Sequence, residues 1–205
     1  MSTVTFPLLA LNRHRMATDG EGVTTLVAGA GCPLHCKWCI NKRLLQEGNP
    51  QIVTAEELFE RVKVDSLYFL ASGGGITFGG GEPLLHADFI REFREICPAG
   101  WKITVETSLF VPKNYLAAVT DAVDLFIVDC KDMNQDTYSA YTGEDGSVMK
   151  ENLEFLLQRT DPDRIIVRVP LIPEYNTAQA QESSAGELRE MGIKRLDLFE
   201  YVKRD

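Results

Sequence analysis

The feature that most constrains the fold is an alternation of short apolar strands and amphipathic helices along most of the 205 residues. Six segments are typical of strands because they are short, apolar and rich in β-branched or aromatic residues. These segments are 23–28, 76–78, 103–107, 125–129, 165–169 and 196–201. Capping residues and 3.6-residue apolar spacing predict helices between them. The predicted helices are 55–64, 87–96, 112–119, 152–158 and 178–191.

This order predicts an α/β fold, because strands that alternate with helices form a parallel sheet. About six such units with right-handed crossovers would wind into a partial (β/α)6 barrel of parallel strands. The length suits one domain over 1–205, with 1–22 as an N-terminal extension and 23–201 as the partial barrel. Ligand sites in such sheets lie at the carboxyl ends of the strands.

The composition excludes several classes of protein. With 44% hydrophobic and 25% charged residues, the chain is an ordinary globular protein. With a net charge of −9, the chain lacks the excess of basic residues that is typical of nucleic-acid-binding proteins. No apolar run approaches the ~18 residues of a membrane span, and the N-terminus has no apolar signal-peptide core. We therefore expect a cytoplasmic protein that binds neither nucleic acid nor membrane.

Three of the five cysteines, Cys32, Cys36 and Cys39, lie close together in a loop after a predicted strand. A disulfide framework is not expected in a reducing compartment. Three thiolates at this spacing can converge on a metal centre, and an iron–sulfur cluster held by only three would leave one iron free for another ligand. A zinc site and three incidental buried thiols are the alternatives. Cys97 and Cys130 are expected in the core.

Two further groups of residues end predicted strands. Gly79, Gly80 and Gly81 follow a strand where the backbone can approach a ligand closely, although an ordinary glycine-rich turn is the alternative. Asp129 and Lys131 are two residues apart at the end of an apolar strand, so their side chains share a face. A ligand site and a mutual ion pair both explain this second arrangement.

The pattern Cys32-x-x-x-Cys36-x-x-Cys39, with Trp38 before the last cysteine, resembles the cluster motif of the radical S-adenosylmethionine (SAM) superfamily. The stretch SGGGITFGGGEP at 72–83 is similar to a signature of one subgroup, the glycyl-radical-enzyme activating enzymes of the pyruvate formate-lyase activating enzyme type. Segments 106–108, 129–131 and 141–143, Arg168 and 172–173 match further positions in the same order. The resemblance extends from about Val23 to Tyr201.

The resemblance implies that Cys32, Cys36 and Cys39 hold a [4Fe-4S] cluster whose fourth iron binds SAM. Reductive cleavage of SAM then gives a 5′-deoxyadenosyl radical, which abstracts hydrogen from a glycine of a partner glycyl radical enzyme. No catalytic side chain beyond the cluster and SAM is implied. The residues implied to bind SAM are Gly79, Gly80, Gly81, Glu82, Lys131 and Arg168. Those implied to bind a monovalent cation are Glu106, Thr107 and Asp129.

The resemblance also implies flavodoxin or ferredoxin as the electron donor, and we expect a monomer. Lys37, Lys42 and Arg43 could form a basic docking patch beside the cluster. The sequence departs from the family pattern at Ile40 and Val202, where activating enzymes usually have histidine. Two alternatives therefore stay open: a compact radical SAM enzyme that acts on a small molecule, of the carboxy-deazaguanine synthase type, and a non-catalytic iron–sulfur electron-transfer protein.

Overall fold

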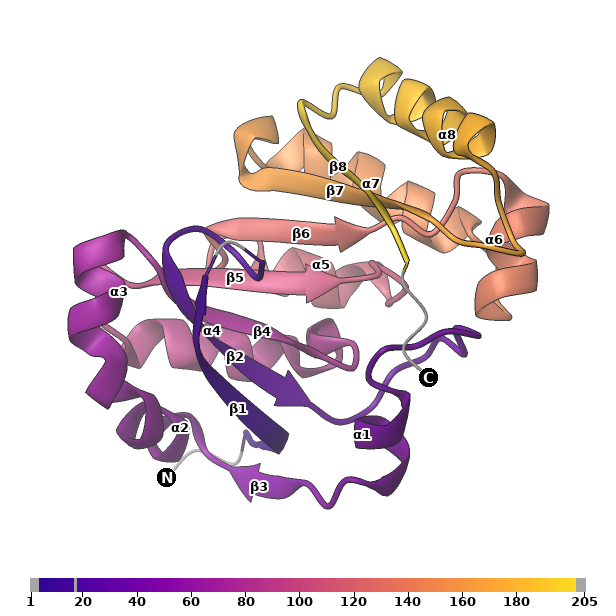
Figure 1. Cartoon of the computed structure of the whole chain (residues 1–205). Helices are drawn as coiled ribbons and strands as arrows, with labels where there is room; N and C mark the ends of the chain where they lie inside the picture. The colour runs from indigo at the N-terminus through magenta and orange to yellow at the C-terminus, as the bar shows by residue number, and fades with distance from the viewer. Residues whose placement is uncertain (1–3, 17, 202–205) are drawn as a thin grey trace.

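The computed structural model describes residues 4–16 and 18–201, which form a mixed eight-stranded sheet with helices packed against it (Figure 1). The strand order is β3-β1-β2-β4-β5-β6-β7-β8, and the pairs from β2 to β8 are all parallel. The strands are β1 Phe6–Met16, β2 Val23–Gly29, β3 Gln51–Val53, β4 Gly75–Gly80, β5 Lys102–Thr107, β6 Leu125–Asp129, β7 Ile165–Leu171 and β8 Arg195–Glu200. The predicted parallel α/β core, a partial barrel, is confirmed.

The helices agree with the sequence pattern where a capping residue marks their start. Thr54 and Glu57 form the predicted capping box of α2, and α5 begins directly after Pro112. The helices are α1 Lys42–Glu47, α2 Ala55–Val62, α3 Ser66–Ser72, α4 Ala87–Ile96, α5 Lys113–Val119, α6 Gln135–Thr142, α7 Ser147–Arg159 and α8 Ala178–Glu190. Short 3-10 helices occupy Lys63–Asp65, Pro83–His86 and Pro162–Arg164.

Strands β1 and β3 were not predicted. The extension 1–22 contains β1, which pairs antiparallel with β2 and, at its start, with β3. Its sequence FPLLALNRHRM places polar residues together at one end and lacks the alternation that identifies a half-buried strand. Helices α1, α3 and α6 were also missed, and each has only 6 to 8 residues. Their stability comes from packing rather than local propensity.

The hydrophobic core lies between the sheet and the helices that cover it. Phe78 of β4 packs edge-on against Phe89 and Phe93 of α4, with ring centroids 6.3 and 5.6 Å away. In Figure 1, α4 and α5 lie behind the sheet, and the parallel strands point toward the side that carries the loop after β2. None of the described helices is long and apolar enough to cross a membrane.

Candidate functional site

The three clustered cysteines lie in the loop that follows β2, and they line one cavity of about 110 Å³. We call it the cysteine cavity. All three are partly exposed, whereas Cys97 and Cys130 are buried, as expected of core residues. The other walls of the cysteine cavity come from the ends of β4, β5 and β6 and from Tyr141 and Tyr201. The loop and the carboxyl edge of the parallel sheet therefore meet at one site, as predicted.

The glycine-rich end of β4 lies against the cysteine loop at backbone contact distance. The amide of Gly81 donates to the carbonyl of Gly29 over 3.0 Å, and the amide of Glu82 donates to Gly31 over 2.8 Å. A Cβ at Gly81 would lie only 2.0 Å from the Gly31 carbonyl oxygen. Asn41 adds a third link, since its Nδ2 donates to the Gly80 carbonyl over 2.8 Å. Only glycine leaves room for this approach.

Glu82 is fully buried at the wall of the cysteine cavity. Thr107 Oγ1 donates to one carboxylate oxygen over 2.7 Å, and the amide and hydroxyl of Ser108 donate to the other over 2.8 and 2.6 Å. Leu84 N donates a longer hydrogen bond of 3.2 Å. Burial raises the pKa of Glu82, although these donors oppose the rise. The carboxylate thus ties the end of β4 to the end of β5.

Lys131 and Asp129 form an ion pair, which is one of the two arrangements that their spacing in the sequence allowed. Lys131 Nζ lies 3.1 Å from Asp129 Oδ2 and donates to the Tyr201 hydroxyl over 3.0 Å. Burial would lower the pKa of Lys131, but Asp129 and Tyr201 outweigh it and raise that pKa well above its usual value. Lys131 is therefore protonated, and these two contacts fix its ammonium group at the wall of the cysteine cavity. A cation in this position suits a ligand with a carboxylate group.

Arg168 and Glu106 meet in an adjoining cavity of about 460 Å³. Arg168 Nη1 donates to Glu106 Oε1 over 2.9 Å, and Nη2 donates to the carbonyl of Thr18. Burial raises the pKa of Glu106 to about 7, because its pairing with Arg168 does not outweigh burial and the nearby Asp129 and Asp19. Arg168 lines the adjoining cavity, while Glu106 lines both cavities.

The predicted site residues are therefore mostly brought together. Gly80, Gly81, Glu82, Lys131, Glu106, Thr107 and Asp129 line the cysteine cavity with the three cysteines. Gly79 lines neither cavity, and its Cα faces Leu26 and Glu106. Val202 lies outside the described residues. Ser108, Tyr141 and Tyr201 have no predicted site role, although Ser108 and Tyr141 belong to segments that match the family pattern.

The donors around the cysteine cavity fit an iron–sulfur cluster. Such clusters are held by cysteine thiolates, and all three clustered cysteines line this cavity. Burial raises the pKa of Cys32 to about 11, so metal binding must displace its proton. Across the described residues, no three acidic, histidine or cysteine side chains are gathered closely enough for a single metal ion.

Comparison with known proteins agrees with this chemistry. The family described as "Radical SAM superfamily" matches residues 26–183. The (2S)-3-sulfopropanediol dehydratase activating enzyme of Klebsiella oxytoca is 32% identical and aligns with 90% of this chain and 78% of its own. The pyruvate formate-lyase 1-activating enzyme of Escherichia coli K12 is 26% identical, with 89% and 76% covered.

A solved structure shows the same fold. SuiB of Streptococcus suis, bound to the precursor peptide SuiA, superposes with a TM-score of 0.67 at 12% identity. The match covers 86% of this chain and 38% of SuiB, so this chain spans less than half of that larger protein. At this identity the likeness concerns the fold alone.

Proposed function

Because this chain belongs to the radical SAM superfamily, we propose that it reductively cleaves SAM at a [4Fe-4S] cluster and thereby activates a partner glycyl radical enzyme. The observation that carries the proposal is the cysteine cavity, where three thiols, the glycine-rich end of β4 and a protonated lysine meet. Two relatives that align with most of this chain are themselves activating enzymes.

Several residues of the cavity then have distinct roles. Cys32, Cys36 and Cys39 would hold the cluster, which together with SAM supplies electron transfer and a carbon-centred radical. Lys131 would bind the SAM carboxylate as a charge-assisted donor. The backbone at Gly80 and Gly81 would face the amino group, and Glu82 would keep that backbone in place through Thr107 and Ser108.

A monovalent-cation site is proposed at the adjoining edge. Glu106 and Thr107 end β5, and Asp129 ends the neighbouring β6, so three oxygen-bearing side chains share one edge of the sheet. Glu106 is paired with Arg168 and Asp129 with Lys131, so cation binding would compete with these ion pairs. Oxygen ligands of this kind suit a hard cation.

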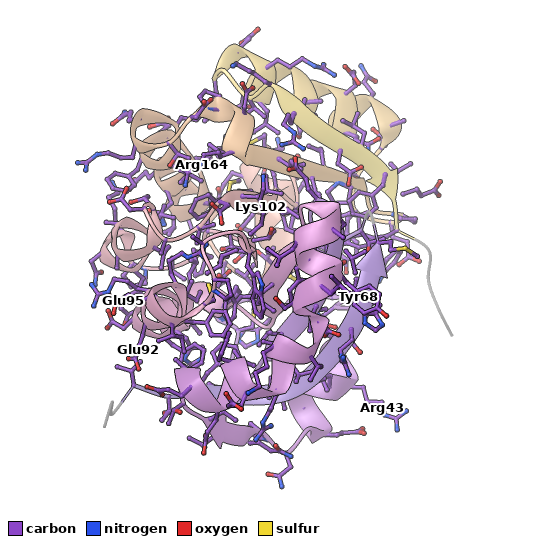
Figure 2. The ribbon with its side chains drawn as sticks, turned by 90° about the vertical axis from the view of Figure 1, so that its left-hand side faces the viewer. Arg43, Tyr68, Glu92, Glu95, Lys102 and Arg164 are labelled. Carbon is purple, nitrogen blue, oxygen red and sulfur yellow. The ribbon has the colours of Figure 1, made fainter. Side chains whose placement is uncertain are left out.

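An acidic electron donor, flavodoxin or ferredoxin, would dock beside the cysteine loop. Lys37, Lys42 and Arg43 are exposed there, and Arg43 projects outward from α1 (Figure 2). On this side a cavity of about 510 Å³ is lined by all three cysteines together with Lys37 and Lys42. The patch would present a local positive charge on a chain whose net charge is −9, although Arg43 Nε also lies 3.2 Å from Glu47 Oε2.

The partner is tested with glycyl radical enzymes of the classes that the relatives activate, including a dehydratase and a formate-lyase. The reconstituted, reduced protein is mixed with SAM and each candidate, once unlabelled and once with deuterium at glycine Cα. With one candidate we expect a glycine-centred radical doublet by electron paramagnetic resonance (EPR) from the unlabelled form and deuterium in 5′-deoxyadenosine from the labelled form. SAM cleavage with neither signal across the whole panel would contradict the activating function and favour a small-molecule substrate.

A further inference from the structure

Tyr138 carries a buried hydroxyl group without a hydrogen-bond partner. Its side chain is 1% exposed, and its oxygen is one of three such unpartnered side-chain atoms among the described residues. The other two belong to Thr24 and Thr160. Burying a hydroxyl without a partner is costly, so an orphaned one in a folded protein calls for an explanation. Tyr138 is the one whose helix packs on the cysteine loop.

Helix α6 holds the cysteine loop on both sides of Cys36. The carbonyl of Thr142 accepts from the amide of His35 over 2.9 Å, and the carbonyl of Tyr141 accepts from Lys37 over 3.1 Å. Tyr138 lies one turn earlier on the same helix, and its carbonyl accepts the Thr142 hydroxyl over 2.8 Å. The orphaned hydroxyl is therefore on the element that positions the middle cysteine.

The electrostatics of Tyr138 agree with this placement. Burial raises its pKa far above the usual value, so the phenol remains protonated and keeps a hydrogen to donate. After burial, the Cys36 side chain has the next largest effect on this pKa, which it raises, ahead of Cys130, Lys131 and Glu82. A negative charge on Cys36 would therefore oppose loss of the Tyr138 proton.

We propose that Tyr138 donates a hydrogen bond to the sulfur atoms at Cys36 when the cluster is bound, and so raises the reduction potential of the cluster. The inference rests on the proposed function, because it requires a cluster on these cysteines. Hydrogen bonds to cluster sulfurs favour the reduced state, which carries one more negative charge. Tyr138 is then a positioning and tuning residue and touches neither SAM nor substrate.

The test is Tyr138→Phe, which removes the hydroxyl and keeps the ring. In the reconstituted holoenzyme, a redox titration followed by EPR should show a more negative potential. At a fixed potential we expect the ratio of reduced to oxidised cluster to fall about tenfold, which corresponds to 59 mV for one electron. Tyr115→Phe, an exposed tyrosine on α5, is the matched control and should leave the potential unchanged.

A second readout uses thermal unfolding with and without cluster. Without cluster, Tyr138→Phe should unfold at the same or a higher temperature than the wild type, because it removes an unsatisfied hydroxyl. With cluster, the gain in unfolding temperature on loading should be smaller in the variant. An equal potential and an equal gain in both proteins would overturn the proposal.

The two proposals fail separately. A shifted potential without any SAM cleavage would keep the role of Tyr138 and reject the radical SAM reaction. Normal SAM cleavage together with an unchanged cluster potential in Tyr138→Phe would keep the radical SAM reaction and reject the role of Tyr138. A wild-type protein that binds no cluster would overturn both.

Discussion

Single side chains decide the chemistry proposed for the cysteine cavity, since three thiols and one ammonium group are its candidate ligand-binding groups. The cysteines could be predicted as candidate metal ligands from spacing, because metal ligands in one loop form a local pattern. The partners of Glu82 could not, because Ser108 is 26 positions away and meets it only through the pairing of β4 with β5. The position of Tyr201 against Lys131, 70 positions apart, has the same long-range origin.

Replacing one cluster ligand is the simplest residue-scale prediction. Cys36→Ala should lower the bound iron and sulfide after anaerobic reconstitution by at least about tenfold, because the cluster loses one of its three protein ligands. The matched control is Cys97→Ala, whose thiol is buried at the end of α4 and lines neither cavity. Equal losses in both variants would show that the ligand assignment is wrong.

Removing the cavity cation should weaken cofactor binding. Lys131→Gln is expected to raise the dissociation constant of SAM by about 10- to 100-fold, as hydrogen bonds to charged groups contribute ~1.5–3 kcal/mol. Equilibrium binding to the reconstituted protein measures this change. Lys150→Gln, which disrupts an ion pair with Glu187 on the helical surface, should not alter it. A similar dissociation constant in wild type and Lys131→Gln would remove Lys131 from the cofactor site.

Among the elements, the contact between β4 and the cysteine loop depends on glycine. Gly81→Ala should destabilise the protein by about 3 kcal/mol, because the new Cβ would meet the Gly31 carbonyl and the backbone must move. Gly186→Ala, in α8 with nothing near its Cα, should stabilise it by up to ~1 kcal/mol. Urea unfolding distinguishes the two. Equal stabilities would mean that the close approach is not maintained in solution.

A buried carboxylate joins the missed strand β1 to the helical layer. Asp65 accepts from Arg13 Nε over 2.7 Å and from Thr25 Oγ1 over 3.0 Å. Burial would raise the pKa of Asp65, but these donors outweigh it and lower that pKa below its usual value. The stabilisation is therefore complete above the unfolded pKa of ~3.9 and is lost as the pH falls through the lower folded pKa.

Asp65→Asn should accordingly destabilise the protein by about 2 kcal/mol at neutral pH, and by less below about pH 4. Urea unfolding at several pH values checks the trend. Asp88→Asn, at an exposed surface pair with Arg91, should change the stability by under about 0.5 kcal/mol at every pH. If Asp65→Asn lowered the free energy of unfolding by the same amount at every pH, the proposed dependence on the ionisation of Asp65 would be contradicted.

The parallel part of the sheet was the most predictable element of the fold. Strands β2, β4, β5, β6 and β7 are short, largely apolar runs that are each followed by a helix, so the evidence lies within about thirty residues of sequence. Strand β3 has three residues and pairs with the start of β1 more than forty positions away. A pairing between such distant segments leaves no local sequence pattern, so the antiparallel strands β1 and β3 could not be predicted.

For the molecule as a whole, docking of an acidic electron donor depends on a local basic patch within a negative surface. Lys42→Glu should slow reduction of the cluster by flavodoxin by roughly three- to tenfold at low ionic strength and by much less in high salt. Lys194→Glu, on the loop before β8, makes the same change of charge elsewhere and should have little effect. Stopped-flow reduction measures both rates. Identical slowing in the two variants would place docking elsewhere.

The central claim is that the protein cleaves SAM reductively at a cluster held by Cys32, Cys36 and Cys39. The most direct measurement incubates the anaerobically reconstituted, reduced protein with SAM and quantifies 5′-deoxyadenosine and methionine. We predict equimolar formation of both products by the wild type and none by Cys36→Ala. A fully loaded, reduced wild-type protein that forms no 5′-deoxyadenosine would contradict the claim and leave an electron-transfer protein as the alternative.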